Sequence, residues 1–60
     1  MITDNAIEIN IDSVEHETHA AYLFLINGEE IWLPKSQIDF NEYLGVVFVP
    51  EWLVNEKEIL

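Results

Sequence analysis

The sequence contains no cysteine and no arginine, and lysine occurs at two positions only. The absence of cysteine excludes a disulfide scaffold and a thiolate metal site. The longest uncharged apolar run, residues 20–26, is far shorter than the roughly 20 residues that a membrane helix needs. Residues 1–5 also lack the basic start and apolar core of a signal peptide. We therefore expect a cytoplasmic protein that makes no membrane contact.

Negative charge dominates the sequence. It has twelve carboxylates but only two cationic side chains, Lys35 and Lys57, which gives a formal net charge of -10. Such an imbalance on a small body raises encounter rates with basic partners and destabilises the folded state by self-repulsion. Direct binding to nucleic acid is disfavoured, since phosphate contacts need Lys and Arg. The expected partner is a basic protein or a nucleoprotein complex.

A chain of 60 residues lies near the lower limit for one hydrophobic core, so we expect a single domain over residues 1–60. Half of the residues are hydrophobic, which is too apolar for a disordered chain. A homodimer remains an open alternative because self-association would enlarge the core. We expect no cofactor.

The pattern of residues 7–26 predicts strands. Residues 7–12 alternate strictly between isoleucine and polar side chains, which predicts a half-buried strand. Residues 13–18 break this alternation, which indicates a turn or a bulged strand end. Residues 19–26 form a continuous apolar run, typical of a central strand covered on both faces.

The dipeptide Asn27-Gly28 follows that run and predicts a tight hairpin, because a type I′ turn needs two residues that tolerate positive φ. Large apolar side chains then occupy both faces of the hairpin. The two-residue loop predicts these cross-strand pairs: Ile26 with Glu29, Phe24 with Ile31, Tyr22 with Leu33, and Leu23 with Trp32.

The C-terminal half begins at Pro34, which is expected to end the hairpin, and Ser36 is expected to cap a single helical turn. Residues 40–43 are expected to be loop. Residues 44–49 predict another strand, with Gly45 at a bulge or a close approach. Pro50 suits the first position of a helix that docks through these side chains: Trp52, Leu53, Ile59 and Leu60.

These segments together predict an α+β fold, with a small antiparallel sheet of three to four strands and a short C-terminal helix. An SH3-like small barrel is the alternative if the strands curl.

Candidate chemistry is sparse, and we expect no enzyme. His16 and His19 lie near two glutamates, but residues three apart on a strand point to opposite faces, so we predict no metal site. Acid–base catalysis needs a carboxyl group held in an apolar pocket, and 60 residues leave little material for a cleft. Ser13 and Ser36 lack a convincing base.

The carboxylates carry the main functional hypothesis. Alternate residues on a strand lie about 6.6 Å apart, so acidic rows present charge at intervals similar in scale to nucleic-acid phosphates. We expect the predicted strands to share one sheet and to gather these partner-binding residues: Glu8, Asp12, Glu15, Glu17, Glu29 and Glu30. A passive, solubilising surface is the alternative.

The tryptophans and Lys35 have simpler interpretations. Trp32 and Trp52 are expected in the core, with a role as interface anchors as the alternative. In that alternative they form an apolar binding surface together with Tyr43. Lys35 is expected to pair with a neighbouring carboxylate, which contributes well under about 1 kcal/mol.

Three short motifs carry a resemblance to a known group of proteins: Gly28-Glu29-Glu30, residues 32–37 (Trp-Leu-Pro-Lys-Ser-Gln) and residues 49–53 (Val-Pro-Glu-Trp-Leu). Over residues 22–54 the chain resembles a set of small acidic proteins carried by phages and prophages. The resemblance implies a phage setting, where such proteins serve as inhibitors of host nucleic-acid machinery, including anti-CRISPR and anti-restriction proteins. On this basis we expect a nucleic-acid mimic that occupies a basic channel of a host defence complex.

Overall fold

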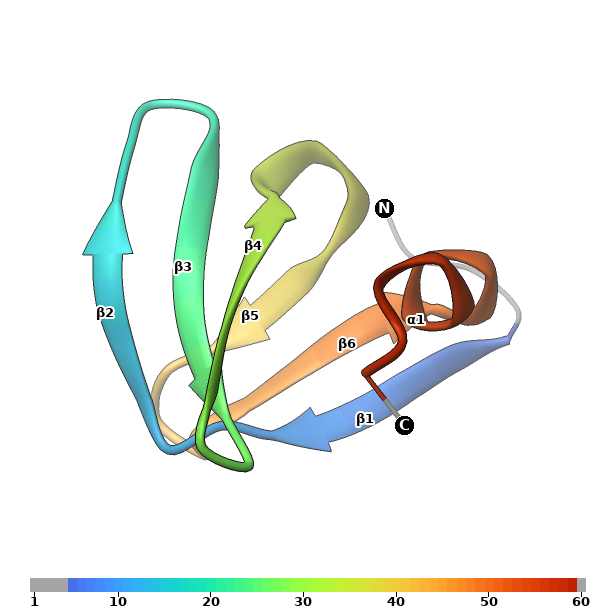
Figure 1. Cartoon of the computed structure of the whole chain (residues 1–60), viewed down its shortest axis with the longest axis horizontal. Coiled ribbons are helices and arrows are strands. Elements are labelled where there is room, and N and C mark those ends of the chain that lie inside the picture. The colour runs from blue at the N-terminus through green and yellow to red at the C-terminus, as the bar shows by residue number, and fades with distance from the viewer. Residues whose placement is uncertain (1–4, 60) are drawn as a thin grey trace.

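Two small antiparallel sheets and one helix make up the computed structural model, which describes residues 5–59 (Figure 1). No helix in this range is long and apolar enough to span a bilayer. The elements, in chain order, are β1 (Ala6–Asn10), β2 (Ser13–Glu17), β3 (Ala21–Ile26), β4 (Glu29–Pro34), the 3-10 turn η1 (Lys35–Gln37), β5 (Asp39–Asn41), β6 (Val46–Pro50) and α1 (Glu51–Lys57).

The strands are divided between two three-stranded sheets, with orders β1-β6-β5 and β2-β3-β4. The chain passes from the first sheet to the second at Ile11 and Asp12. Here the Ile11 N–H donates to the Gly45 carbonyl at 3.0 Å and the Asp12 N–H donates to the Leu25 carbonyl at 2.7 Å. The fold is α+β as predicted, but the strands number six in two sheets, and within residues 5–59 they do not close into a barrel.

The core lies between the two sheets and the helix. Phe24, Leu33 and Val47 are fully buried and come from strands in both sheets. The rings of Phe24 and Phe40 meet edge to face with centroids 5.1 Å apart, a favourable arrangement for aromatic rings. No polar or charged residue is buried in the described part of the chain, so apolar packing supports this core.

The β3–β4 hairpin confirms the prediction from Asn27-Gly28. Asn27 has φ 52° and Gly28 has φ 81°, the two positive angles of a type I′ turn. All four predicted cross-strand pairs occur in the observed register. Pro34 ends β4 as expected, and a helical turn follows, although Pro34 rather than Ser36 precedes it and no side chain caps it.

The helix α1 packs two successive side chains, Leu53 and Val54, into the core. Trp52 was expected to dock with Leu53, but it is 55% exposed because it lies on the opposite side of a short helix. Pro50 precedes the helix with extended backbone angles and ends β6, one position before the predicted start. The predicted contact of Leu60 lies outside the described residues.

Other predictions need correction. The bulge predicted for residues 13–18 is confirmed, but it lies in a separate strand, β2, and the predicted strand at 7–12 ends at Asn10. Residues 39–41 are strand β5 rather than loop, because they pair with β6. Gly45 lies outside β6 with φ 68°, in the turn that joins β5 to β6. Only one face of β3 meets the core, since Leu23 and Leu25 on the other face are half-buried.

Candidate functional site

Every acidic side chain in the described part of the chain is exposed. Within residues 5–59 the only ion pair joins the Lys35 ammonium to the Glu17 carboxylate, and the same ammonium lies 4.8 Å from the centre of the Tyr22 ring. This confirms the predicted pairing of Lys35. The remaining ten described carboxylates therefore face solvent without a cation within ion-pairing distance. These ten carboxylates gain no ion-pair energy, and even a surface ion pair contributes little to the free energy of folding. This charge distribution therefore does not stabilise the fold.

The six predicted partner-binding residues do not share one sheet. Glu8 lies on β1 and belongs to the sheet β1-β6-β5, whereas Glu15, Glu17, Glu29 and Glu30 belong to β2-β3-β4. Asp12 lies in the link between the sheets. The expectation that the strands gather all six in a single sheet is wrong, because the chain changes sheets immediately after β1.

One face of the β2-β3-β4 sheet combines carboxylates with apolar side chains, and we name it the hairpin face. Leu23 lies between His16 and Trp32 in the register, and Leu25 lies between Ser13 and Glu30. Directly opposed residues share a face of the sheet. The hairpin face consists of Ser13, Glu15, His16, Leu23, Leu25, Glu30 and Trp32.

The bulge in β2 explains how Glu15 reaches this face. The register shifts between Val14 and His16, so Glu15 is the extra residue. Its carboxylate accepts a hydrogen bond from the Ser13 hydroxyl, which places Glu15 on the side of the sheet that Ser13 occupies. On the same side, the rings of His16 and Trp32 meet edge to face over Leu23, with centroids 6.0 Å apart. The bulge therefore adds a second carboxylate to the hairpin face, which already carries Glu30.

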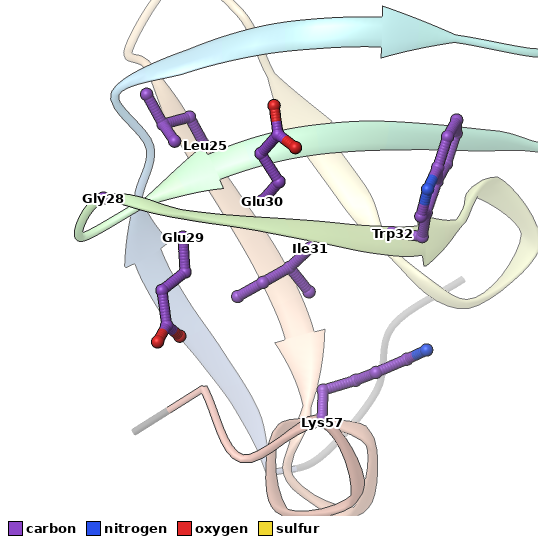
Figure 2. Close-up of a pocket in the computed structure, with 7 residues that line it drawn as sticks. All are labelled: Leu25, Gly28, Glu29, Glu30, Ile31, Trp32 and Lys57. Carbon is purple, nitrogen blue, oxygen red and sulfur yellow. The ribbon is translucent and has the colours of Figure 1, made fainter.

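An open hollow of about 820 Å³ runs along β4, lined by residues from β3, from the hairpin turn, from β4 and from the end of α1 (Figure 2). Figure 2 shows that Glu30 and Trp32 point to one side of β4, whereas Glu29 and Ile31 point to the other. Lys57 comes from α1 and is the one cation of this lining. The hollow is lined by Leu25, Gly28, Glu29, Glu30, Ile31, Trp32 and Lys57.

The other sheet presents a second acidic area. In the register of β1-β6-β5, Phe48 lies directly between Glu8 and Asp39, so two carboxylates flank one half-buried ring. A smaller hollow of about 270 Å³ lies beside it and is also lined by Glu42 and Tyr43. The sequence pattern predicted no site role for Asp39 and Glu42, because β5 has only three residues and its residues Phe40 and Asn41 were expected to be loop.

Three large aromatic side chains are exposed: Trp32 at 42%, Trp52 at 55% and Tyr43 at 97%. The expectation of core positions for both tryptophans is therefore wrong. Trp32 lines the hollow along β4, Tyr43 lines the hollow beside Phe48, and Trp52 lines neither of these two.

The described residues offer little for catalysis or metal binding. No group of three His, Cys, Asp or Glu side chains in residues 5–59 is arranged to hold a metal ion. The two histidines are separated by the end of β2, and His16 packs against Trp32. General acid–base chemistry needs an enclosed carboxyl group, and no carboxyl group is buried among these residues. What these residues do present is exposed charge beside apolar side chains.

Comparisons with protein-family models, with curated proteins and with solved structures returned no match to this chain. The resemblance to small acidic phage proteins therefore stays a prediction from the three short motifs.

Proposed function

We propose that this protein is a non-catalytic acidic binding domain that occupies the Lys/Arg-lined, nucleic-acid-binding surface of a basic protein or nucleoprotein complex. The observation that supports this proposal most directly is the exposure of all eleven described carboxylates, with one ion pair among them. Unpaired charges of one sign on a small rigid body produce a strong field, which attracts basic surfaces and speeds association with them.

The placement of the carboxylates on strands favours mimicry of nucleic acid over a general acidic coating. Five of the six predicted residues lie on strands. Glu8 and Asp39 also flank Phe48 on adjacent strands. Neighbouring strands are about 4.8 Å apart, so these two positions are separated by roughly 10 Å. Charges carried at such intervals on a regular backbone suit a groove that binds phosphates.

In this proposal the domain acts as an inhibitor of host nucleic-acid machinery, as anti-CRISPR and anti-restriction proteins do. This part rests on the resemblance of residues 28–37 and 49–53 to small acidic phage proteins. No residue role is taken from that resemblance.

The proposal can be tested by capture from a bacterial lysate. The immobilised protein is exposed to nuclease-treated lysate at low salt and eluted with a salt gradient, and the eluted protein is then purified. We expect a nucleic-acid-binding protein whose affinity for the domain falls steeply with salt, because the Debye length shrinks from about 10 Å at 0.1 M to about 3 Å at 1 M. Duplex DNA should compete with the domain for the purified partner.

A matched pair of variants separates local charge from total charge. Glu29→Lys with Glu30→Lys should weaken binding strongly, whereas Glu56→Lys with Glu58→Lys changes the net charge equally outside the predicted surface. Equal effects of the two double variants would argue for a diffuse field without a defined surface. Binding that is insensitive to salt, or simultaneous binding of DNA and this domain to the partner, would refute the proposal.

The exposure of Trp32 favours a second candidate function, an accessory or assembly module that binds a partner protein through apolar contacts. Trp32 is 42% exposed on the hairpin face and is supported there by His16. In this case Trp32→Ala should abolish partner binding in a domain that remains folded, while Trp52→Ala and the lysine variants leave binding intact. The measurement is affinity for the captured partner beside the circular dichroism spectrum of each variant.

A further inference from the structure

Of the four strands at sheet edges, β4 is the longest regular one. The edge strand β2 is interrupted by its bulge, β5 has three residues, and β1 is contacted by α1. In contrast, β4 has six residues without a register shift. Its free edge borders the hollow that Figure 2 shows. An exposed regular edge offers unpaired backbone groups to another strand.

The direction of these backbone groups follows from the hydrogen bonds of the hairpin. The Lys35 N–H donates to the Ala20 carbonyl at 2.8 Å, so these two residues form a hydrogen-bonded pair. In an antiparallel ladder, hydrogen-bonded and non-hydrogen-bonded pairs alternate. Glu30 and Trp32 consequently occupy non-hydrogen-bonded pairs with β3, and their N–H and C=O groups point to the free edge.

The side chains at this edge indicate which strand would fit there. A second copy added here would bring together two chains that each carry a net charge of -10, and like charges that come to lie opposite each other across strands are destabilising. A strand that carries Lys or Arg would instead place a cation beside Glu30 and a further cationic or apolar side chain beside the ring of Trp32. The half-exposed Leu23 and Leu25 extend the apolar part of this surface.

We propose that β4 is a strand-addition site, at which an extended Lys/Arg-containing segment of the partner protein pairs with the backbone of Glu30 and Trp32. This inference deepens the proposed function and rests on it, because it names the part of the basic partner that makes contact. Such recognition draws affinity from main-chain hydrogen bonds and specificity from alternate side chains. The hairpin face receives one row of those side chains, and the hollow that contains Lys57 lies along the path of the added strand.

The test uses a defined probe, an extended peptide of about eight alternating Lys and Val residues, enough to cover an average strand. Hydrogen exchange by NMR is measured on the full chain with and without peptide. Exchange of the Glu30 and Trp32 amides should slow by at least about tenfold at saturation, since both gain an acceptor. Exchange of the Ile31 amide should stay unchanged because it already donates to β3.

Two controls separate strand addition from simple charge attraction. The same peptide with methylated backbone nitrogens keeps its charges, and it should bind at least about tenfold more weakly because its donors are blocked. Glu30→Lys should weaken peptide binding by a similar factor, whereas the matched reversal Glu56→Lys on α1 should change it by less than about threefold.

The outcomes distinguish this inference from the proposed function. Binding that is salt-sensitive but unaffected by backbone methylation, without slower exchange at Glu30 and Trp32, would overturn strand addition and leave the proposed function standing. A peptide that does not bind at about 1 mM would do the same. Slower exchange at these amides that grows with protein concentration in the absence of peptide would replace the proposal with a homodimer through β4.

Discussion

Glu58 is expected to be a source of strain at the end of α1, and its replacement by glycine should stabilise the fold. Glu58 follows the last helical residue and has φ 56° and ψ 43°, in the left-handed region. Its N–H donates to the Asn55 carbonyl at 3.2 Å, and the Ile59 N–H donates to the Val54 carbonyl at 3.1 Å. This pair of bonds is the Schellman motif, in which glycine is the preferred residue at this position.

The size of the effect can be worked from three contributions. A left-handed conformation costs a residue with a side chain about 1–2 kcal/mol, and glycine loses roughly 0.5–1 kcal/mol through its greater freedom in the unfolded chain. Removal of a carboxylate from the negative end of the helix dipole adds about 0.3 kcal/mol. Glu58→Gly should therefore raise the free energy of unfolding by about 1 kcal/mol, which corresponds to a rise in Tm of about 4–8 °C for a domain of this size.

Thermal unfolding followed by circular dichroism measures this difference, and Glu58→Gln provides the control. Glutamine removes the charge but keeps the side chain, so it should recover only the dipole contribution of about 0.3 kcal/mol. If glycine and glutamine raise Tm equally, the backbone at residue 58 is not strained. A lower Tm for the glycine variant would refute the assignment of the motif itself.

Three further predictions concern the core, the hairpin and the charge. Phe24→Ala should remove about 3–5 kcal/mol from a fold whose total stability is about 3–9 kcal/mol, so circular dichroism should show a Tm lowered by at least about 12 °C. Tyr43→Ala should stay within about 0.5 kcal/mol of the parent. Gly28→Ala should cost about 1 kcal/mol in urea unfolding, from backbone strain alone because an added Cβ meets no atom within 4 Å; an unchanged midpoint would contradict the type I′ turn. Raising NaCl from 0.1 M to 1 M should stabilise the chain by about 1 kcal/mol, and a variant with several Glu→Gln changes should lose most of this salt effect.

The hairpin was predictable because its signals are local. Asn27 and Gly28 determine the turn, the turn sets the register, and the register places each pair across the strands. The alternation of Ile7, Ile9 and Ile11 likewise predicts which face of the first strand turns inward, and Ile9 is buried. These features depend on neighbouring residues alone, so the amino-acid pattern carries them in full.

The division into two sheets was not predictable because it depends on pairing between distant segments. No glycine or proline marks the change of sheet at Ile11 and Asp12. The three residues of β5 are too few to show a period, and they are a strand only through pairing with β6. The core position predicted for Trp52 was wrong for a related reason. The helix α1 has only seven residues, and its packing against β1 and β6 decides which of its faces is buried.

The same limit applies to the candidate site. Exposure of the acidic residues follows from their charge, but the surface on which each lies depends on the sheet that holds its strand. Glu15 shows this most clearly, because only the register of β2 against β3 reveals that Glu15 is the extra residue of the bulge.

The division of the strands also implies an order of folding. The β2-β3-β4 sheet is a meander of sequence neighbours, joined by short turns that close at little entropic cost. The other sheet joins β1 to β6, near opposite ends of the described chain, and must close a loop that spans the whole meander. Non-local pairing of this kind is slow to form. We expect the meander, with β4 at its edge, to form before β1 and β6 pair, so that opening of the β1–β6 pair would leave that edge in place.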